Sequence, residues 1–182
     1  MRKFCAKTVA AFVLVCLMAV PMAAPAYAAG SDLERMAQTD QIIVVGTYVY
    51  GDAAYTFAAG EPVYSYDVAE ISAEARAGVS YPIYLYDQSG NLLLVQHVGF
   101  TINGSAGNDS FAETSKWNWY TTDLADGLLL GGVKNTRLSN TKAEHAFTWY
   151  YGGDTYRTTA AFALNRSTGS VLLSNLQSSV NA

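Results

Sequence analysis

The amino-acid sequence predicts an all-β protein, namely a single antiparallel β-sandwich or small barrel of about eight to ten short strands. Three observations support this prediction. Short runs of β-branched and aromatic residues recur at roughly ten-residue spacing. Turn-forming Gly, Asn and Asp residues separate these runs. Aromatic residues recur at every second position within several runs, which is the side-chain period of a strand.

The first candidate strand covers residues 42–50, which are mostly β-branched or aromatic. The turn-forming pair Gly51 and Asp52 ends it. Residues 55–58 predict a second short strand, and residues 62–68 alternate between two faces as a third. Residues 70–77 then predict a helical turn or a loop, because the strand period is lost there.

A hairpin is predicted in the middle of the chain. Residues 80–86 form its first strand and residues 92–102 its second. The connection, residues 87–91, contains Gly90, which can adopt the left-handed conformation that a tight turn needs. The apolar residues of the second strand are nearly continuous over 92–95, which predicts burial on both faces.

Residues 103–114 are rich in Gly, Ser, Asn and Asp and predict the longest loop. A second hairpin is predicted around residues 165–169, where polar residues and a glycine again separate two apolar runs. The remaining candidate strands are residues 117–122, 128–130, 133–138, 146–151, 156–164 and 170–173.

The first 28 residues have the pattern of a secretory signal peptide of bacterial type. Arg2, Lys3 and Lys7 form a basic start, and an apolar run follows over Val9 to Met22. The run is followed by small residues that end in an A-x-A pattern at Ala28, where we expect cleavage. We expect residues 29–41 to be a polar segment with one or two helical turns, and residues 42–182 to form one β-rich domain.

Removal of this leader leaves 154 of the 182 residues, with 8 basic against 15 acidic side chains. Both cysteines, Cys5 and Cys16, are lost with it, so the mature chain has no disulfide and no thiolate metal site. Val15 is too large to precede a lipidated Cys16, which argues against a lipoprotein.

The excess of acidic over basic side chains argues against nucleic acid as a ligand. The mature chain also has no apolar run of transmembrane length, so we expect a secreted, cell-surface or periplasmic protein.

Aromatic residues alternate along five candidate strands. The pairs and the triplet are Tyr48/Tyr50, Tyr64/Tyr66, Tyr84/Tyr86, Trp117/Trp119 and Phe147/Trp149/Tyr151. Because residues two apart share a face of a strand, each strand carries an aromatic stripe. Two interpretations remain open. The stripes belong to the core, or they form an exposed platform that binds a ligand.

The opposite face of each strand suggests which stripes are exposed. Ile83 and Leu85 oppose Tyr84 and Tyr86, so the tyrosine face is expected to be partly open. The same argument applies to residues 42–50, where aliphatic side chains oppose Tyr48 and Tyr50. The face that carries Trp117 and Trp119 is instead expected to be buried.

The leading hypothesis is a secreted bacterial domain that binds a glycan, a protein surface or a small planar ligand without catalysis. The residues predicted to be exposed and to bind are Tyr84, Tyr86, Trp149 and Tyr151. No cofactor and no metal ion are expected. One alternative is a self-assembling or cell-surface structural protein that associates through its sheet edges.

A second alternative is a small secreted hydrolase that uses carboxylates, although the sequence favours no particular pair. The two histidines, His97 and His145, lie in candidate strands or at their ends and match no catalytic or zinc motif. Oxygen-rich segments at residues 103–109 and 123–126 are candidate calcium loops, but neither has the EF-hand spacing. Turn chemistry explains the same residues.

Overall fold

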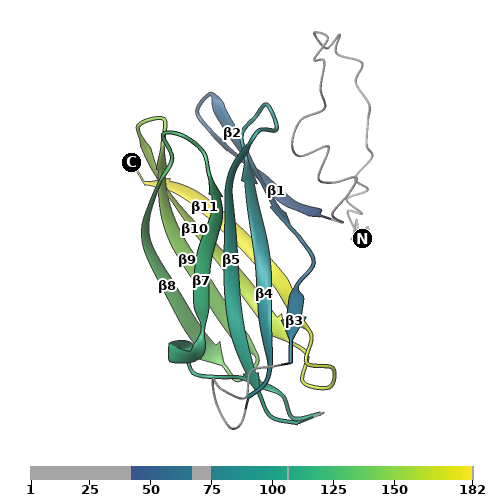
Figure 1. Ribbon diagram of the computed structural model, residues 1–182. Coiled ribbons are helices and arrows are strands. Elements are labelled where there is room, and N and C mark those ends of the chain that lie inside the picture. The colour runs from purple at the N-terminus through teal and green to yellow at the C-terminus, as the bar shows by residue number, and fades with distance from the viewer. Residues whose placement is uncertain (1–41, 67–74, 106, 182) are drawn as a thin grey trace, which may run out of the picture.

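The computed structural model describes residues 42–66, 75–105 and 107–181 (Figure 1). Within these ranges the regular structure is strands and one short 3-10 helix, which confirms the prediction of an all-β protein. No helix among these residues is long and apolar enough to cross a bilayer. The predicted leader, residues 1–28, and the polar segment, residues 29–41, lie outside the described residues.

The strands are β1 (Ile43–Tyr50), β2 (Ala53–Ala59), β3 (Val63–Ser65), β4 (Ala75–Tyr86), β5 (Leu92–Asn103), β6 (Ser110–Phe111), β7 (Asn118–Leu124), β8 (Leu129–Ser139), β9 (Lys142–Tyr151), β10 (Asp154–Leu164) and β11 (Val171–Asn181), and the 3-10 helix η1 is Thr114–Lys116. They form two antiparallel sheets. The first has the order β1-β2-β4-β5-β6, with β3 beside β4 and β7 beside β5. The second has the order β11-β10-β9-β8. Figure 1 shows the two sheets as layers that face each other.

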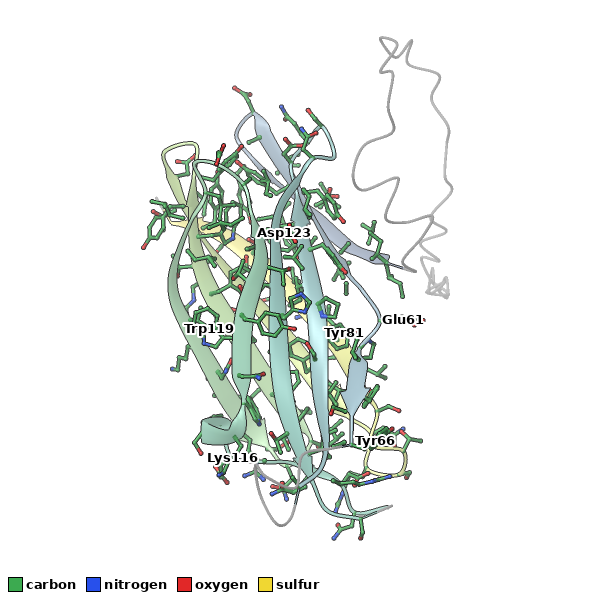
Figure 2. All side chains as sticks on the ribbon, viewed as in Figure 1. Glu61, Tyr66, Tyr81, Lys116, Trp119 and Asp123 are labelled. Carbon is green, nitrogen blue, oxygen red and sulfur yellow. The ribbon has the colours of Figure 1, made fainter. Side chains whose placement is uncertain are left out.

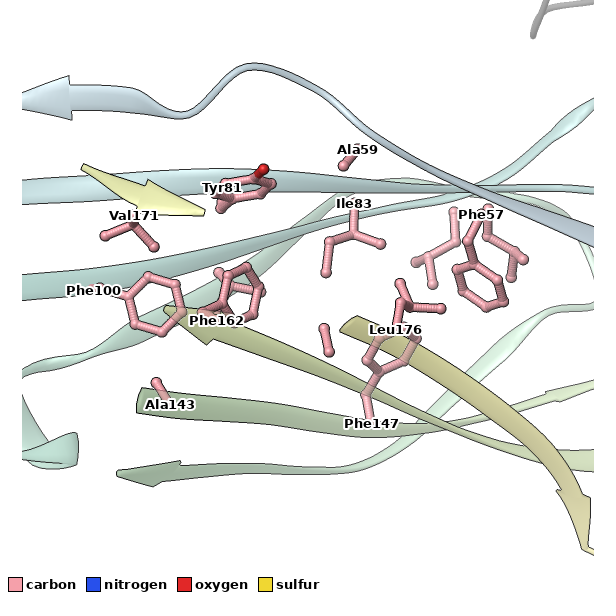
Figure 3. Packing of buried hydrophobic residues seen from close by; sticks show 14 of the residues in the cluster. Phe57, Ala59, Tyr81, Ile83, Phe100, Ala143, Phe147, Phe162, Val171 and Leu176 are labelled. Atoms are coloured by element: carbon pink, nitrogen blue, oxygen red, sulfur yellow. The ribbon is translucent and has the colours of Figure 1, made fainter. Parts of the chain in front are cut away.

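One core lies between the two sheets. It contains Phe57, Ile83 and Phe100 from the first sheet and Phe147 and Phe162 from the second (Figure 3). The rings of Phe100 and Phe162 meet across the interface with centroids 4.8 Å apart. Burial of such a side chain contributes about 1.5–3 kcal/mol, so contacts of this kind hold the layers together.

The β1 strand shows why the expected exposure of its tyrosines is wrong. A bulge between Val44 and Gly46 shifts the pairing with β2 and reverses which residues point inward. As a result Tyr48 and Tyr50 pack against the core, whereas Val49 is 69% exposed. The Tyr48 hydroxyl donates a hydrogen bond to a backbone carbonyl of β11, which joins the two sheets along this side.

The predicted turns agree with the structure better than the predicted strand ends do. The connection at residues 87–91 joins β4 to β5, and Gly90 has a φ of 78°. The strand β4 begins at Ala75, so residues 75–77 are extended, whereas residues 70–74 of the predicted helical turn or loop lie outside the described residues. The strand β8 is continuous where two strands were predicted, and β11 continues well beyond residue 173.

Candidate functional site

Two of the four predicted binding residues are buried. Tyr86 and Trp149 are each 0% exposed, so the expectation that they face solvent is wrong. Tyr86 packs with Ile42 and Ala58 in a small cluster beside the core. The indole of Trp149 stacks on Tyr156 with centroids 4.0 Å apart, and its Nε1 donates a hydrogen bond of 3.0 Å to a threonine hydroxyl of β10.

The other two predicted residues, Tyr84 and Tyr151, are half-buried. Tyr84 packs against the cluster that contains Tyr86, whereas Tyr151 packs against the core between the sheets. Trp149 also belongs to that core. The structure therefore divides the four residues between two separate clusters and does not bring them together into one surface.

Exposed aromatic residues occur elsewhere in the molecule, and two of them lie on β7. Trp119 is 45% exposed and Tyr120 is 46% exposed, whereas Trp117, just before the strand, is buried. The expectation that both tryptophans are buried is therefore wrong for Trp119. The reason is the position of β7, which among the described strands pairs only with β5. Figure 2 labels Trp119, which belongs to this strand.

A groove of about 330 Å³ lies on the face of the first sheet that points away from the core. Gly78 and Ser80 of β4 form its floor, and Val63 of β3 stands at one end. Asn118 and Tyr120 of β7 stand at the other end. The hollow exists because small residues occupy alternate positions of β4, where larger side chains would fill it.

Strand pairing explains why these residues meet. Val63 pairs with Ser80, Ser80 pairs with Gly99, and Gly99 pairs with Asn118. One row of neighbours therefore crosses four strands on a single face of the sheet. Lys116, at the end of η1, also lines the groove.

The Tyr120 ring is supported by a histidine. His97 lies opposite Tyr120 in the β5–β7 pair, and the two rings are stacked with centroids 4.5 Å apart and planes inclined by 5°. The His97 Nε2 atom lies 3.3 Å from the Thr122 hydroxyl. Burial lowers the pKa of His97, and the negative charge of Asp123 offsets part of this effect. The imidazole is therefore neutral at pH 7 and supports the tyrosine ring as an uncharged partner.

Two polar side chains, Ser80 and Asn118, line the groove. The Ser80 hydroxyl oxygen is buried beneath the groove surface and has no hydrogen-bond partner among the described residues. The Asn118 carboxamide lies directly over Gly99, where a Cβ would overlap it. The exposed Asn118 side chain therefore forms part of the groove surface, and the absence of a side chain at Gly99 permits this position.

The segment at residues 103–109, one of the two candidate calcium loops, has a structural explanation. Asp109 is buried and forms an ion pair with Arg76, and the Asn108 side chain accepts a hydrogen bond from Arg166. Within the described ranges, no group of three or more His, Cys, Asp or Glu side chains is placed to hold a metal ion. These contacts indicate that the loop oxygens hold the loop against β4 and against the turn between β10 and β11.

Asn118, Tyr120 and the supporting His97 were not among the binding residues predicted from the sequence. A signal was present in the alternation of small residues, because Gly78 and Ser80 share one face of their strand and Gly99 and Thr101 share one face of theirs. Two such stripes on adjacent strands predict a hollow in a sheet. The predicted binding residues came instead from the aromatic stripes, and most residues of those stripes belong to the core or pack against it.

Comparisons with protein-family models, with curated proteins and with solved structures find no match for this chain.

Proposed function

We propose that this protein is an exported, non-catalytic binding domain whose ligand is a glycan held in the groove between β3 and β7. The observation that carries the proposal is the combination, in one groove, of an exposed aromatic ring with small floor residues and an exposed carboxamide. Sugar rings have apolar C–H faces, which pack on aromatic rings, and hydroxyl edges, which need hydrogen-bond partners. Tyr120 supplies the first surface, and the exposed Asn118 carboxamide supplies the second.

The rigidity of the site supports the same function. The stack with His97 holds the Tyr120 ring in place before any ligand arrives, which reduces the entropy lost on binding. The predicted leader at residues 1–28 supports export to a compartment where glycans of cell walls or host surfaces are accessible.

Binding to polysaccharides tests the proposal, with Tyr120→Ala as the first variant. We expect the protein to be retarded in native gels that contain cellulose derivatives, xylan, mannan or soluble chitin, and Tyr120→Ala to weaken the binding at least about tenfold. Trp119→Ala is the matched control, because Trp119 is equally exposed but lies on the opposite face of the same strand. Failure to bind any of these polysaccharides contradicts the proposal, as does an equal loss in both variants.

A second candidate function, self-assembly, is favoured by the β1 strand. This strand lies at the edge of the first sheet, and Ile43, Val44 and Val49 on it are 72%, 53% and 69% exposed. An apolar strand with no described hydrogen-bonded neighbour on one side is a template for pairing with another chain. If β1 mediates assembly, sedimentation velocity will show a mass that rises with concentration, and Val49→Lys will restore the monomer. A wild-type protein that remains monomeric at high concentration contradicts this candidate.

A further inference from the structure

We infer that the ligand is an extended, unbranched glycan that crosses the strands from β3 to β7 and is bound along its interior, not at a chain end. This inference rests on the proposed function and specifies the class of ligand for the same groove.

The shape of the groove determines the direction of the chain. Its lining spans four strands but only about two alternate positions along each strand. With strands about 4.8 Å apart and about 3.3 Å per residue along a strand, the groove measures roughly 14 Å across the strands and roughly 7 Å along them. The longer dimension therefore crosses the strands and accommodates about three sugar units.

The ends of the groove are edges of the sheet. The strand β3 pairs only with β4, and β7 pairs only with β5, so no described strand continues the sheet beyond either end. Val63 at the β3 end is 66% exposed, and Tyr120 at the β7 end is 46% exposed. A chain can therefore enter at one edge and leave at the other while it packs on apolar side chains at both ends.

One long side of the groove is bounded by larger side chains. Pro82, His97 and Tyr120 form the next row across the sheet, because Pro82 pairs with His97 and His97 pairs with Tyr120. A branch that points toward this row meets a proline ring and the stacked aromatic rings. This boundary favours an unbranched chain.

Calorimetric titration with oligosaccharides of increasing length tests this inference. The probes are disaccharides, tetrasaccharides and hexasaccharides of the cello, xylo, manno and chito series, chosen to match the polysaccharide that binds. We expect Kd to fall at least about tenfold from the disaccharide to the tetrasaccharide and then to change little. A hexasaccharide whose reducing end has been converted to the alditol should bind as tightly as the unmodified one.

The variant Val63→Ser distinguishes a chain that crosses the strands from a ligand that sits at one end. Val63 is exposed, so the substitution leaves the core intact. We expect it to raise the Kd of the tetrasaccharide about fivefold and to leave the Kd of the disaccharide unchanged, because a short ligand stays on Tyr120 at the far end.

Three results overturn the inference and leave the proposed function intact: equal affinities for disaccharide and tetrasaccharide, loss of binding when the reducing end is modified, and no effect of Val63→Ser on the tetrasaccharide. If none of the polysaccharides binds at all, the proposed function itself fails, and this inference fails with it.

Discussion

The imidazole of His145 is completely buried between the two sheets. Its Nδ1 atom lies 2.6 Å from the Asn135 carboxamide oxygen, and its Nε2 atom has no hydrogen-bond partner among the described residues. Burial lowers the pKa of His145 to about 4, because a charged imidazolium is poorly solvated there. The Glu144 side chain points to the other face of the strand and so does not compensate for the charge.

This burial makes stability depend on pH. In the unfolded chain His145 titrates near 6.5, so between about pH 6.5 and 4 the unfolded state binds more protons than the folded state. The contribution of His145 to the free energy of unfolding should therefore fall as the pH falls through this window, by up to about 3 kcal/mol at pH 4, and by little more below it. Urea denaturation at pH 7 and pH 4 measures the loss.

His145→Gln is the control, because glutamine stays neutral and retains a polar group near Asn135. The acidic residues titrate in both proteins, so only the difference between them reports on His145. An equal loss of stability in the variant and in the wild type refutes this role for the histidine.

The pairing of β5 with β7 depends on a glycine. Gly99 lies opposite Asn118, and the Asn118 carboxamide occupies the space that a Cβ on Gly99 would need. The exposed strand β7 thereby contributes a polar group to the groove without moving away from β5. This is a property of two neighbouring strands, and it depends on a residue that itself carries no functional group.

We expect Gly99→Ala to lower the free energy of unfolding by about 1–3 kcal/mol, because the new methyl group displaces Asn118 or separates the strands. Asn118→Ala removes the obstruction, so Gly99→Ala should cost clearly less in that background. Chemical denaturation of the two single variants and the double variant gives the coupling energy. Additive effects would show that Gly99 does not act through Asn118.

Across the whole molecule, the packing of two sheets leaves the three tryptophans in different environments. Trp117 is 8% exposed and Trp149 is 0% exposed, and both belong to the core, whereas Trp119 on the β7 edge is 45% exposed. Their exposure therefore reports on the assembled fold, because any rearrangement of the two layers changes which indoles meet solvent.

Iodide quenching of fluorescence measures this arrangement directly. In the folded protein iodide should reach one of the three tryptophans, and Trp119→Phe should remove nearly all of the accessible component. Unfolding in urea should expose the remaining two. If Trp119→Phe retains a large quenchable component, Trp117 or Trp149 is accessible and the packing of the sheets differs from that described.

The sequence alone determined the all-β class, most of the strands and the turns between them. These features depend on local properties, namely the side-chain period of two, the preference of β-branched and aromatic residues for strands, and glycines that adopt a positive φ. The loop at residues 87–91 is an example, because the Asp87 carboxylate accepts hydrogen bonds from the backbone N–H groups of Ser89 and Asn91 within the same turn.

Only the tertiary structure decided which face of each strand is buried and where the groove lies. The exposure of Trp119 follows from the edge position of β7, and the burial of Tyr48 follows from a bulge in β1. The groove needs small residues on β4 and β5 to be brought into register with Val63 and Tyr120, which are 57 positions apart in the chain. Burial depends on neighbours that are distant in sequence, whereas strand period and turn chemistry depend on neighbours that are adjacent.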